Sequence, residues 1–286
     1  MLPAGLAALT SAGLISYNKV IEKTRMKIAI TGKGGVGKTT VCALLARAFA
    51  DSGRKVLAVD ADPNATLAAC LGFPSPDSIV PLSEMTDLIE ERTGAKPGAP
   101  GSFFKLNPRV EDIPERFAVQ YNGISLLQMG GIKKGGTGCY CPEGVFLKNL
   151  VSHLFLSDQD VLLMDMEAGI EHLGRGTASG VDWLLIVVEP SRQSLETAGR
   201  IQLLAKDIGL NQIGVIGNKI RSGQDAEIIA GRVAPSPLLG AIPYDDALRL
   251  AEFEGRAPEA SLPEVAFAIK KITAHLLEKT GQLAAR

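Results

Sequence analysis

The sequence predicts an α/β fold, a doubly wound, mostly parallel β-sheet with helices on both faces. Two observations carry this prediction. Short runs rich in Val, Ile and Leu alternate with helical patterns along the chain, and these runs are continuously apolar, as in parallel strands covered on both sides. The expected strands are 27–31, 55–60, 124–128, 161–164, 183–188, 213–217 and 238–241, with helices over 38–51, 194–208 and 262–278. In such a sheet, ligands bind beyond the carboxyl ends of the strands.

Two segments fall outside this alternation. Residues 94–122 are rich in Pro and Gly and have no clear period, which predicts an insertion or a long loop. Residues 1–25 precede the first strand and a second methionine, Met26, and we interpret them as a poorly ordered extension or an upstream start. The remainder, 26–286, is expected to form a single domain.

The composition of the chain limits the classes of binding partner that we expect. The 286 residues are 46% apolar and 21% charged, which is typical of a folded protein with a sizeable core. Lys and Arg number 30 against 31 Asp and Glu, so the net charge favours neither nucleic acid nor an anionic membrane as a partner. No run is long enough to insert stably into a bilayer. The 4 cysteines are expected to be thiols in a reducing compartment, which predicts a cytoplasmic protein.

A phosphate-binding loop connects the first strand to the first helix. Residues 32–39, GKGGVGKT, fit the pattern G-x-x-x-x-G-K-[ST] in the strand-to-helix context that this pattern requires. Its glycines allow backbone N–H groups to surround an anion at the helix N-terminus. Lys38 is expected to reach the outer phosphates, and the Thr39 hydroxyl to bind Mg²⁺. The predicted nucleotide-binding residues here are Gly32, Gly34, Gly35, Val36, Gly37, Lys38, Thr39 and Thr40.

A second lysine within this loop indicates a subclass. Lys33, in the order GKGGVGKTT, resembles the deviant Walker A motif, or P-loop, of the MinD, ParA and nitrogenase-iron-protein ATPases. This resemblance implies a P-loop NTPase fold and a homodimer in which Lys33 contacts phosphates of the opposite subunit. A second cation would stabilise the charge that develops during phosphoryl transfer, so Lys33 joins Lys38 as a predicted catalytic residue.

Acidic residues end two of the expected strands. Asp60 and Asp62 lie in a segment that resembles switch I of these ATPases, and Asp165 lies in one that resembles Walker B and switch II. The resemblance implies that Asp62 positions the attacking water and that Asp60 supports the metal shell. Asp165 is expected to bind Mg²⁺ through water, because this hard cation prefers oxygen ligands and keeps its hydration. The chain is therefore predicted to be a Mg²⁺-dependent ATPase.

The expected base pocket favours adenine. Residues 218–221 stand where GTPases of related fold carry N-K-x-D, but the fourth position is Arg221, which has donors only and cannot accept from guanine. ATP is therefore the predicted nucleotide, with Asn218 as the amide contact. The turn at Pro243 and Tyr244 resembles the second wall of the pocket in this class.

A cysteine pair predicts a metal site. Cys139 and Cys141, at C-x-C spacing, can hold one soft or borderline ion but leave half of a tetrahedral shell open. A symmetric dimer would supply the second pair. Four thiolates suit Zn²⁺ or Ni²⁺, and both remain open. Cys42 and Cys70 are interpreted as core residues.

The cysteine segment also carries a specific resemblance. The runs GGIKKGGTGCYCPE (130–143) and MDMEAGIEHLGRGTA (164–178), with VDADPN and IPYDD, resemble the CooC family of ATPases, which mature the nickel–iron–sulfur cluster of CO dehydrogenase. The resemblance extends from Met26 to the last helix. It implies a metallochaperone for nickel insertion, with the CO dehydrogenase apo-enzyme as partner. In the switch II resemblance, Glu171 and His172 could couple nucleotide state to the metal or simply be surface residues.

Three alternatives share parts of this pattern. An accessory ATPase for nickel loading of acetyl-CoA synthase resembles the same family and stays open. A MinD- or ParA-like partitioning ATPase shares the P-loop and the dimer but does not explain C-x-C. An electron carrier like the nitrogenase iron protein would bridge its cluster with cysteines far apart in sequence, whereas Cys139 and Cys141 are nearly adjacent.

Overall fold

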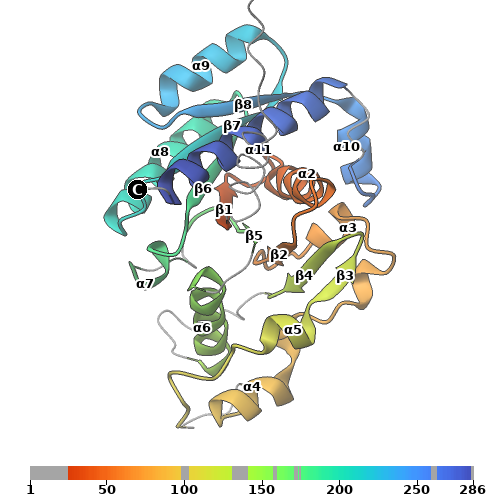
Figure 1. Cartoon of the computed structure of the whole chain (residues 1–286), viewed down its shortest axis with the longest axis vertical. Coiled ribbons are helices and arrows are strands. Elements are labelled where there is room, and N and C mark those ends of the chain that lie inside the picture. Colours follow the sequence, from red (N-terminus) through yellow and green to blue (C-terminus); the bar gives the residue numbers. More distant parts are fainter. Residues whose placement is uncertain are drawn as a thin grey trace, which may run out of the picture.

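The computed structural model describes residues 25–97, 103–130, 141–156, 160–170, 173, 175–258 and 263–284. Within these residues, eight strands form one sheet in the order β3-β4-β2-β5-β1-β6-β7-β8 (Figure 1). The strands are β1 Met26–Gly32, β2 Val56–Asp60, β3 Val119–Tyr121, β4 Ile124–Gln128, β5 Val161–Asp165, β6 Trp183–Val188, β7 Ile213–Ile220 and β8 Leu238–Pro243. Neighbouring strands are parallel except β3 and β4. The predicted mostly parallel sheet is confirmed.

Helices cover both faces of this sheet (Figure 1). The α-helices are α2 Lys38–Asp51, α3 Leu67–Cys70, α4 Thr86–Thr93, α5 Ile113–Phe117, α6 Pro142–Leu156, α7 Arg175–Ala178, α8 Arg192–Asp207, α9 Gly223–Val233, α10 Asp246–Phe253 and α11 Pro263–Ala284, with 3₁₀ turns η1 Pro76–Ser78 and η2 Leu82–Glu84. One apolar cluster contains residues of α2, α3, α10 and α11, and the other contains residues of α4 to α9. In the part of the chain that is described, none of these helices has the length and apolar character needed to cross a membrane.

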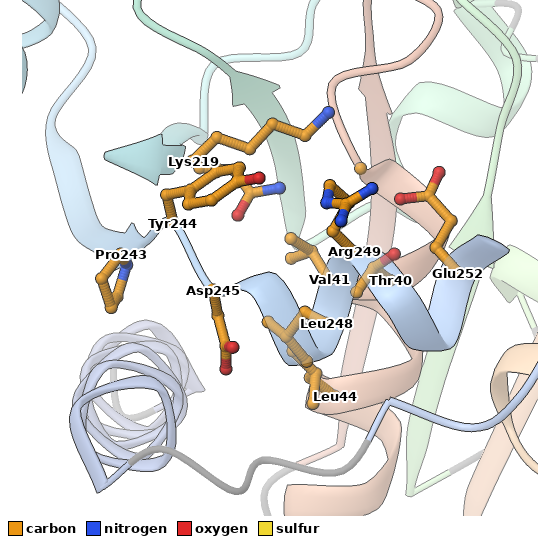
Figure 2. A pocket seen from close by; sticks show the side chains of 12 residues that line it. Thr40, Val41, Leu44, Lys219, Pro243, Tyr244, Asp245, Leu248, Arg249 and Glu252 are labelled. Atoms are coloured by element: carbon orange, nitrogen blue, oxygen red, sulfur yellow. The ribbon is translucent and has the colours of Figure 1, made fainter. Parts of the chain in front are cut away.

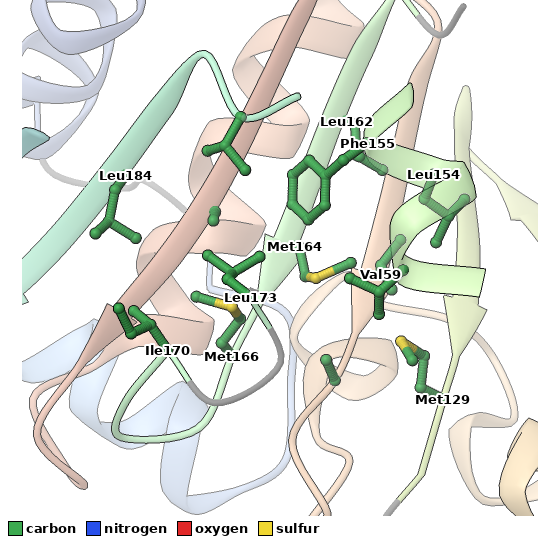
Figure 3. Packing of buried hydrophobic residues seen from close by; sticks show 14 of the residues in the cluster. Val59, Met129, Leu154, Phe155, Leu162, Met164, Met166, Ile170, Leu173 and Leu184 are labelled. Carbon is green, nitrogen blue, oxygen red and sulfur yellow. The ribbon is translucent and has the colours of Figure 1, made fainter. Parts of the chain in front are cut away.

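The continuous apolar runs follow from this two-sided cover. Successive side chains of a strand point to opposite faces, so a strand in the middle of the sheet needs apolar residues at every position. In β5, Leu162 and Met164 belong to one cluster and Val161 and Leu163 to the other, and all four are fully buried. Figure 3 shows Leu162 and Met164 packed beside Phe155 of α6.

The prediction of an irregular segment over 94–122 is wrong in part. Helix α5 and strand β3 lie within it, and β3 forms an antiparallel hairpin with β4 through Asn122 and Gly123. Both turn residues have positive φ, 46° and 77°, which Asn and Gly tolerate. Arg92 of α4 donates to both carboxylate oxygens of Asp112 at 2.8 Å, which fastens the start of α5 to α4. The contacts that stabilise this segment therefore join one element to another and do not follow a periodic pattern within the segment.

Candidate nucleotide site

The residues predicted to bind nucleotide come together at the carboxyl edge of the sheet. Strand β1 ends at Gly32, β2 at Asp60 and β5 at Asp165. In the parallel register, Asp165 lies opposite both Ile30 of β1 and Asp60 of β2. The P-loop and the two acidic strand ends therefore lie side by side, although more than 100 residues separate Asp60 from Asp165 in the chain.

The P-loop conformation depends on glycine at two positions. Gly32 has a φ of 150°, and a Cβ atom there would lie 2.3 Å from the carbonyl oxygen of Val187. Gly37, the N-cap of α2, has a φ of 91°, and its Cβ would lie 2.4 Å from Nδ2 of Asn218. Both positions combine a left-handed backbone with a close approach from a neighbouring strand, so an L side chain fits neither. The loop delivers Lys38 to a buried position and leaves Thr39 half-buried.

Asp165 has the environment of a cation ligand. It is 1% exposed, and neither carboxylate oxygen has a donor in hydrogen-bonding geometry among the described residues. Burial raises its pKa to about 7; the Thr39 hydroxyl beside it and Lys38 oppose this rise, while Asp60 and Asp62 add to it. Two unpartnered oxygens next to a hydroxyl suit a hard divalent cation, whose charge would favour the ionised carboxylate. The residues present therefore fit Mg²⁺.

Asp60 and Asp62 have different surroundings. Both oxygens of the Asp60 carboxylate accept backbone N–H groups, from Leu67 at 2.9 Å and from Asp62 at 3.2 Å. Burial raises the pKa of Asp60 to about 6, and these hydrogen bonds oppose the rise. Asp62 is half-buried, and its Oδ1 accepts the N–H of Asn64 at 2.9 Å. Asp60 thus fixes the loop that follows β2, and Asp62 lies on that loop.

A cavity next to the P-loop contains the predicted base contacts (Figure 2). Its lining residues are Gly37, Thr40, Val41, Leu44, Asn218, Lys219, Pro243, Tyr244, Asp245, Leu248, Arg249 and Glu252. The Nδ2 amide of Asn218 donates to the carbonyl of Val36 at 2.8 Å, which leaves Oδ1 for a base. Arg221 does not line the cavity; its guanidinium carbon lies 4.0 Å from the centroid of the Tyr244 ring. The structure thus brings Asn218, Pro243 and Tyr244 to one cavity, and their contact with a base stays a prediction.

Two residues at this site were missed by sequence reasoning. Lys219 donates from Nζ to the carbonyl of Gly35 at 2.7 Å, and its only sequence signal was its place beside Asn218. Thr31, fully buried in β1, donates from Oγ1 to the carbonyl of Gly169 at 2.7 Å and so joins the P-loop strand to the segment after Asp165. A hydroxyl in a mostly apolar strand was the only signal for Thr31.

The metal prediction lies largely outside the described residues. Cys139 is in the undescribed stretch 131–140, and Glu171 and His172 are also undescribed. Cys141 lies just before α6 and is half-buried; burial raises the pKa of its thiol. Where the chain is described, no three side chains of His, Cys, Asp or Glu converge on a possible metal position. The C-x-C site therefore stays a prediction. Cys42 is buried and Cys70 packs against the same apolar cluster, as core residues do.

Known proteins with similar sequences and structures identify the class. Residues 27–258 match the family described as the CobQ/CobB/MinD/ParA nucleotide binding domain. The chain is 46% identical over 258 residues to the carbon monoxide dehydrogenase accessory protein CooC of Rhodospirillum rubrum, covering 90% of this chain and 98% of that protein. It is 49% identical over 234 residues to an uncharacterized ATP-binding protein of Methanocaldococcus jannaschii, covering 81% and 90%. The MinD protein in the Aquifex aeolicus MinC:MinD complex superposes with a TM-score of 0.62 at 26% identity, covering 88% of this chain and 96% of that one.

The fold and the P-loop site thus define an ATP-binding ATPase of the CobQ/CobB/MinD/ParA class. Within this class, the chain belongs to the CooC-type accessory ATPases. The predicted fold class, the ATPase activity and the family resemblance are confirmed.

Proposed function

We propose that this chain is a dimeric ATPase that carries a metal ion and assists nickel insertion into the nickel–iron–sulfur cluster of CO dehydrogenase. The observation that supports this most is the 46% identity to CooC, which extends over 98% of a protein whose name links it to CO dehydrogenase. Nickel is the cargo in this proposal, and the nucleotide site drives its delivery.

The phosphates bind in the P-loop, where Lys38 and the inward N–H groups neutralise their charge. Thr39 and Asp165 would hold Mg²⁺, and Asp60 would support them from the adjacent strand. When bound, the Mg²⁺ ion would neutralise charge on the outer phosphates. The support for these roles is the pair of unpartnered oxygens on buried Asp165 beside Thr39.

Hydrolysis requires Asp62 and Lys33. Asp62 accepts a hydrogen bond from the attacking water and orients it, and Lys33 of the partner subunit adds a second cation at the phosphates. The loop around Lys33 suits this arrangement, because Gly34 and Gly35 are exposed and so leave the outer face of the P-loop open to a second protomer.

The cargo binds to Cys139 and Cys141 of both subunits. In support, Cys141 lies at the start of α6, outside the apolar clusters, with its side chain partly exposed. Four thiolates around one ion would suit Ni²⁺ or Zn²⁺. Nucleotide-driven changes in the dimer would open or close this shared site.

Reconstitution of apo-CO dehydrogenase tests the proposal. We expect this protein, with ATP, Mg²⁺ and limiting Ni²⁺, to raise CO oxidation above the level that Ni²⁺ alone produces. A Cys139→Ser/Cys141→Ser variant should give no increase although it still hydrolyses ATP. Equal activation with and without the protein would remove CO dehydrogenase as client. Activation of apo-acetyl-CoA synthase instead would assign the other client that the family resemblance leaves open.

A further inference from the structure

Two consecutive residues at the end of β7 hold two consecutive carbonyls of the P-loop. Lys219 donates from Nζ to the carbonyl of Gly35 at 2.7 Å, and Asn218 donates from Nδ2 to the carbonyl of Val36 at 2.8 Å. A lysine ammonium bonded to a carbonyl forms a charge-assisted hydrogen bond, which is stronger than one between neutral groups. One of these two contacts is therefore made by a residue, Lys219, that has no role in the proposed chemistry so far.

The backbone at Lys219 is adapted to this contact. Its φ is 59°, in the left-handed region that a lysine rarely adopts. The register of β7 with β8 is irregular between Gly217 and Ile220, so the strand leaves its regular path at this point. Figure 2 shows the Lys219 side chain extended alongside the Tyr244 ring. Non-glycine residues persist in this conformation where the surrounding structure holds them, often at functional sites.

A carboxylate lies within ion-pair distance of the lysine ammonium. Oε2 of Glu189 lies 3.9 Å from Nζ of Lys219, and both side chains are partly exposed. Glu189 itself is held in place: its N–H donates to Oγ of Ser194 at 3.1 Å, and Ser191 donates to its Oε1 at 3.2 Å. The ammonium is thus placed between a fixed carboxylate and the P-loop.

We propose that Lys219 is a positioning residue that sets the P-loop peptides in the phosphate-binding orientation before nucleotide arrives. In a planar trans peptide, the carbonyl and the following N–H point in opposite directions. Holding the carbonyls of Gly35 and Val36 toward β7 therefore turns the N–H groups of Val36 and Gly37 to the opposite side. In agreement, the N–H of Val36 points into the loop, with the Lys33 carbonyl at 3.4 Å. This inference rests on the phosphate site proposed above and not on the metal cargo.

Lys219 also lines the base cavity, so a test must separate an effect on the phosphates from an effect on the base. In the full chain, Lys219→Asn tolerates the left-handed backbone but is too short to reach Gly35. Calorimetry with Mg²⁺ then compares ATP with inorganic triphosphate, which has no base. We expect Lys219→Asn to weaken both by a similar factor, about tenfold, or about 1.4 kcal/mol. Lys219→Arg, which keeps a long cationic donor, should restore most of the affinity.

Tyr244→Leu is the matched control, because Tyr244 lines the same cavity and its hydroxyl donates to Asp246 rather than to a residue of the P-loop. It should weaken ATP and leave inorganic triphosphate unchanged. If Lys219→Asn weakens ATP alone, Lys219 acts on the base and the proposal is wrong. Unchanged affinity for both ligands would also overturn it. If the wild-type chain binds neither ATP nor inorganic triphosphate, the phosphate site itself is wrong. Binding of the metal cargo at the cysteines has no bearing on either outcome.

Discussion

At the scale of single residues, the three carboxylates near the P-loop differ in what their oxygens contact. Asp165 is buried, and among the described residues neither of its oxygens has a hydrogen-bond partner, whereas both oxygens of Asp60 accept backbone N–H groups. Asp62 is half-buried and accepts one N–H, from Asn64. These surroundings suit three different tasks: Asp165 has oxygens available to a cation, Asp60 shapes the loop, and Asp62 has an oxygen available to a water molecule.

The proposed role of Asp62 leads to a kinetic prediction. Asp62→Ala should keep ATP affinity, because Lys38 and the P-loop N–H groups remain, but turnover should fall by at least about a hundredfold through loss of the group that orients water. Steady-state hydrolysis and nucleotide binding, measured on the same preparation, check this. Asp62→Asn is the control for shape, since an amide oxygen can still accept the Asn64 N–H. Turnover equal to wild type in Asp62→Ala would show the assignment to be wrong.

The base pocket leads to a second prediction at this scale. One of the two N–H donors of Asn218 Nδ2 goes to the Val36 carbonyl, and its Oδ1 is an acceptor that matches the amino group of adenine. Arg221 supplies donors only and stacks on Tyr244. We expect ATP to bind at least tenfold more tightly than GTP, or about 1.4 kcal/mol. Competition against a fluorescent nucleotide measures this ratio, and equal affinities would contradict the pocket assignment.

At the scale of elements, the sequence predicted the features that depend on residues close together in the chain. Strand β5 is apolar from Val161 to Met164 because both of its faces are covered, and this requirement is visible in four successive residues. The P-loop is predictable for the same reason, since its glycines and Lys38 are contiguous. Strand β3 has three residues, and the start of α5 is fastened by Arg92, 20 positions before Asp112. Lys219 lies 184 positions from Gly35. No local pattern contains the Arg92–Asp112 and Lys219–Gly35 contacts, so α5 and Lys219 were missed. Strand β3 was missed although its pairing with β4 is local and its turn, Asn122-Gly123, is a hairpin signal.

The start of strand β1 bears on whether the domain needs the first 25 residues in order to fold. Met26 is fully buried and its N–H donates to the carbonyl of Asp160 at 2.8 Å, and the family match begins at residue 27. We expect a chain that begins at Met26 to fold, bind ATP and hydrolyse it at the wild-type rate. Circular dichroism melting and ATPase assays check this, with the full chain as reference. A lower melting temperature or lost turnover would show that the extension contributes to the folded domain.

At the scale of the whole molecule, the chain leaves β4 at the edge of the sheet that holds the nucleotide site. Strand β4 runs parallel to β2, so its carboxyl end lies beside Asp60, and the N–H of Met129 donates to the Asp60 carbonyl at 2.9 Å. The chain that leaves β4 at this point continues to Cys141 and α6. In the dimer proposed above, contact between protomers across this edge would bring both P-loops together, which is the physical route we propose for coupling ATP to the metal.

This arrangement predicts the metal stoichiometry. If Cys139 and Cys141 of two chains share one thiolate site, the protein binds one ion per dimer, and Cys139→Ser abolishes binding because a neutral hydroxyl is a poor substitute for a thiolate. The same substitution should weaken dimerisation without nucleotide, since the ion connects the chains, while ATP still joins them through Lys33. Metal analysis with light scattering, with ATP, with ADP and without nucleotide, measures both quantities.

Cys70→Ser is the matched control, a thiol outside the pair, and should leave stoichiometry and assembly unchanged. ATP binding by the Cys139→Ser monomer should persist, because the P-loop is intact. One ion per monomer with no change in assembly would exclude the shared site, and normal metal binding by Cys139→Ser would exclude this cysteine as a ligand.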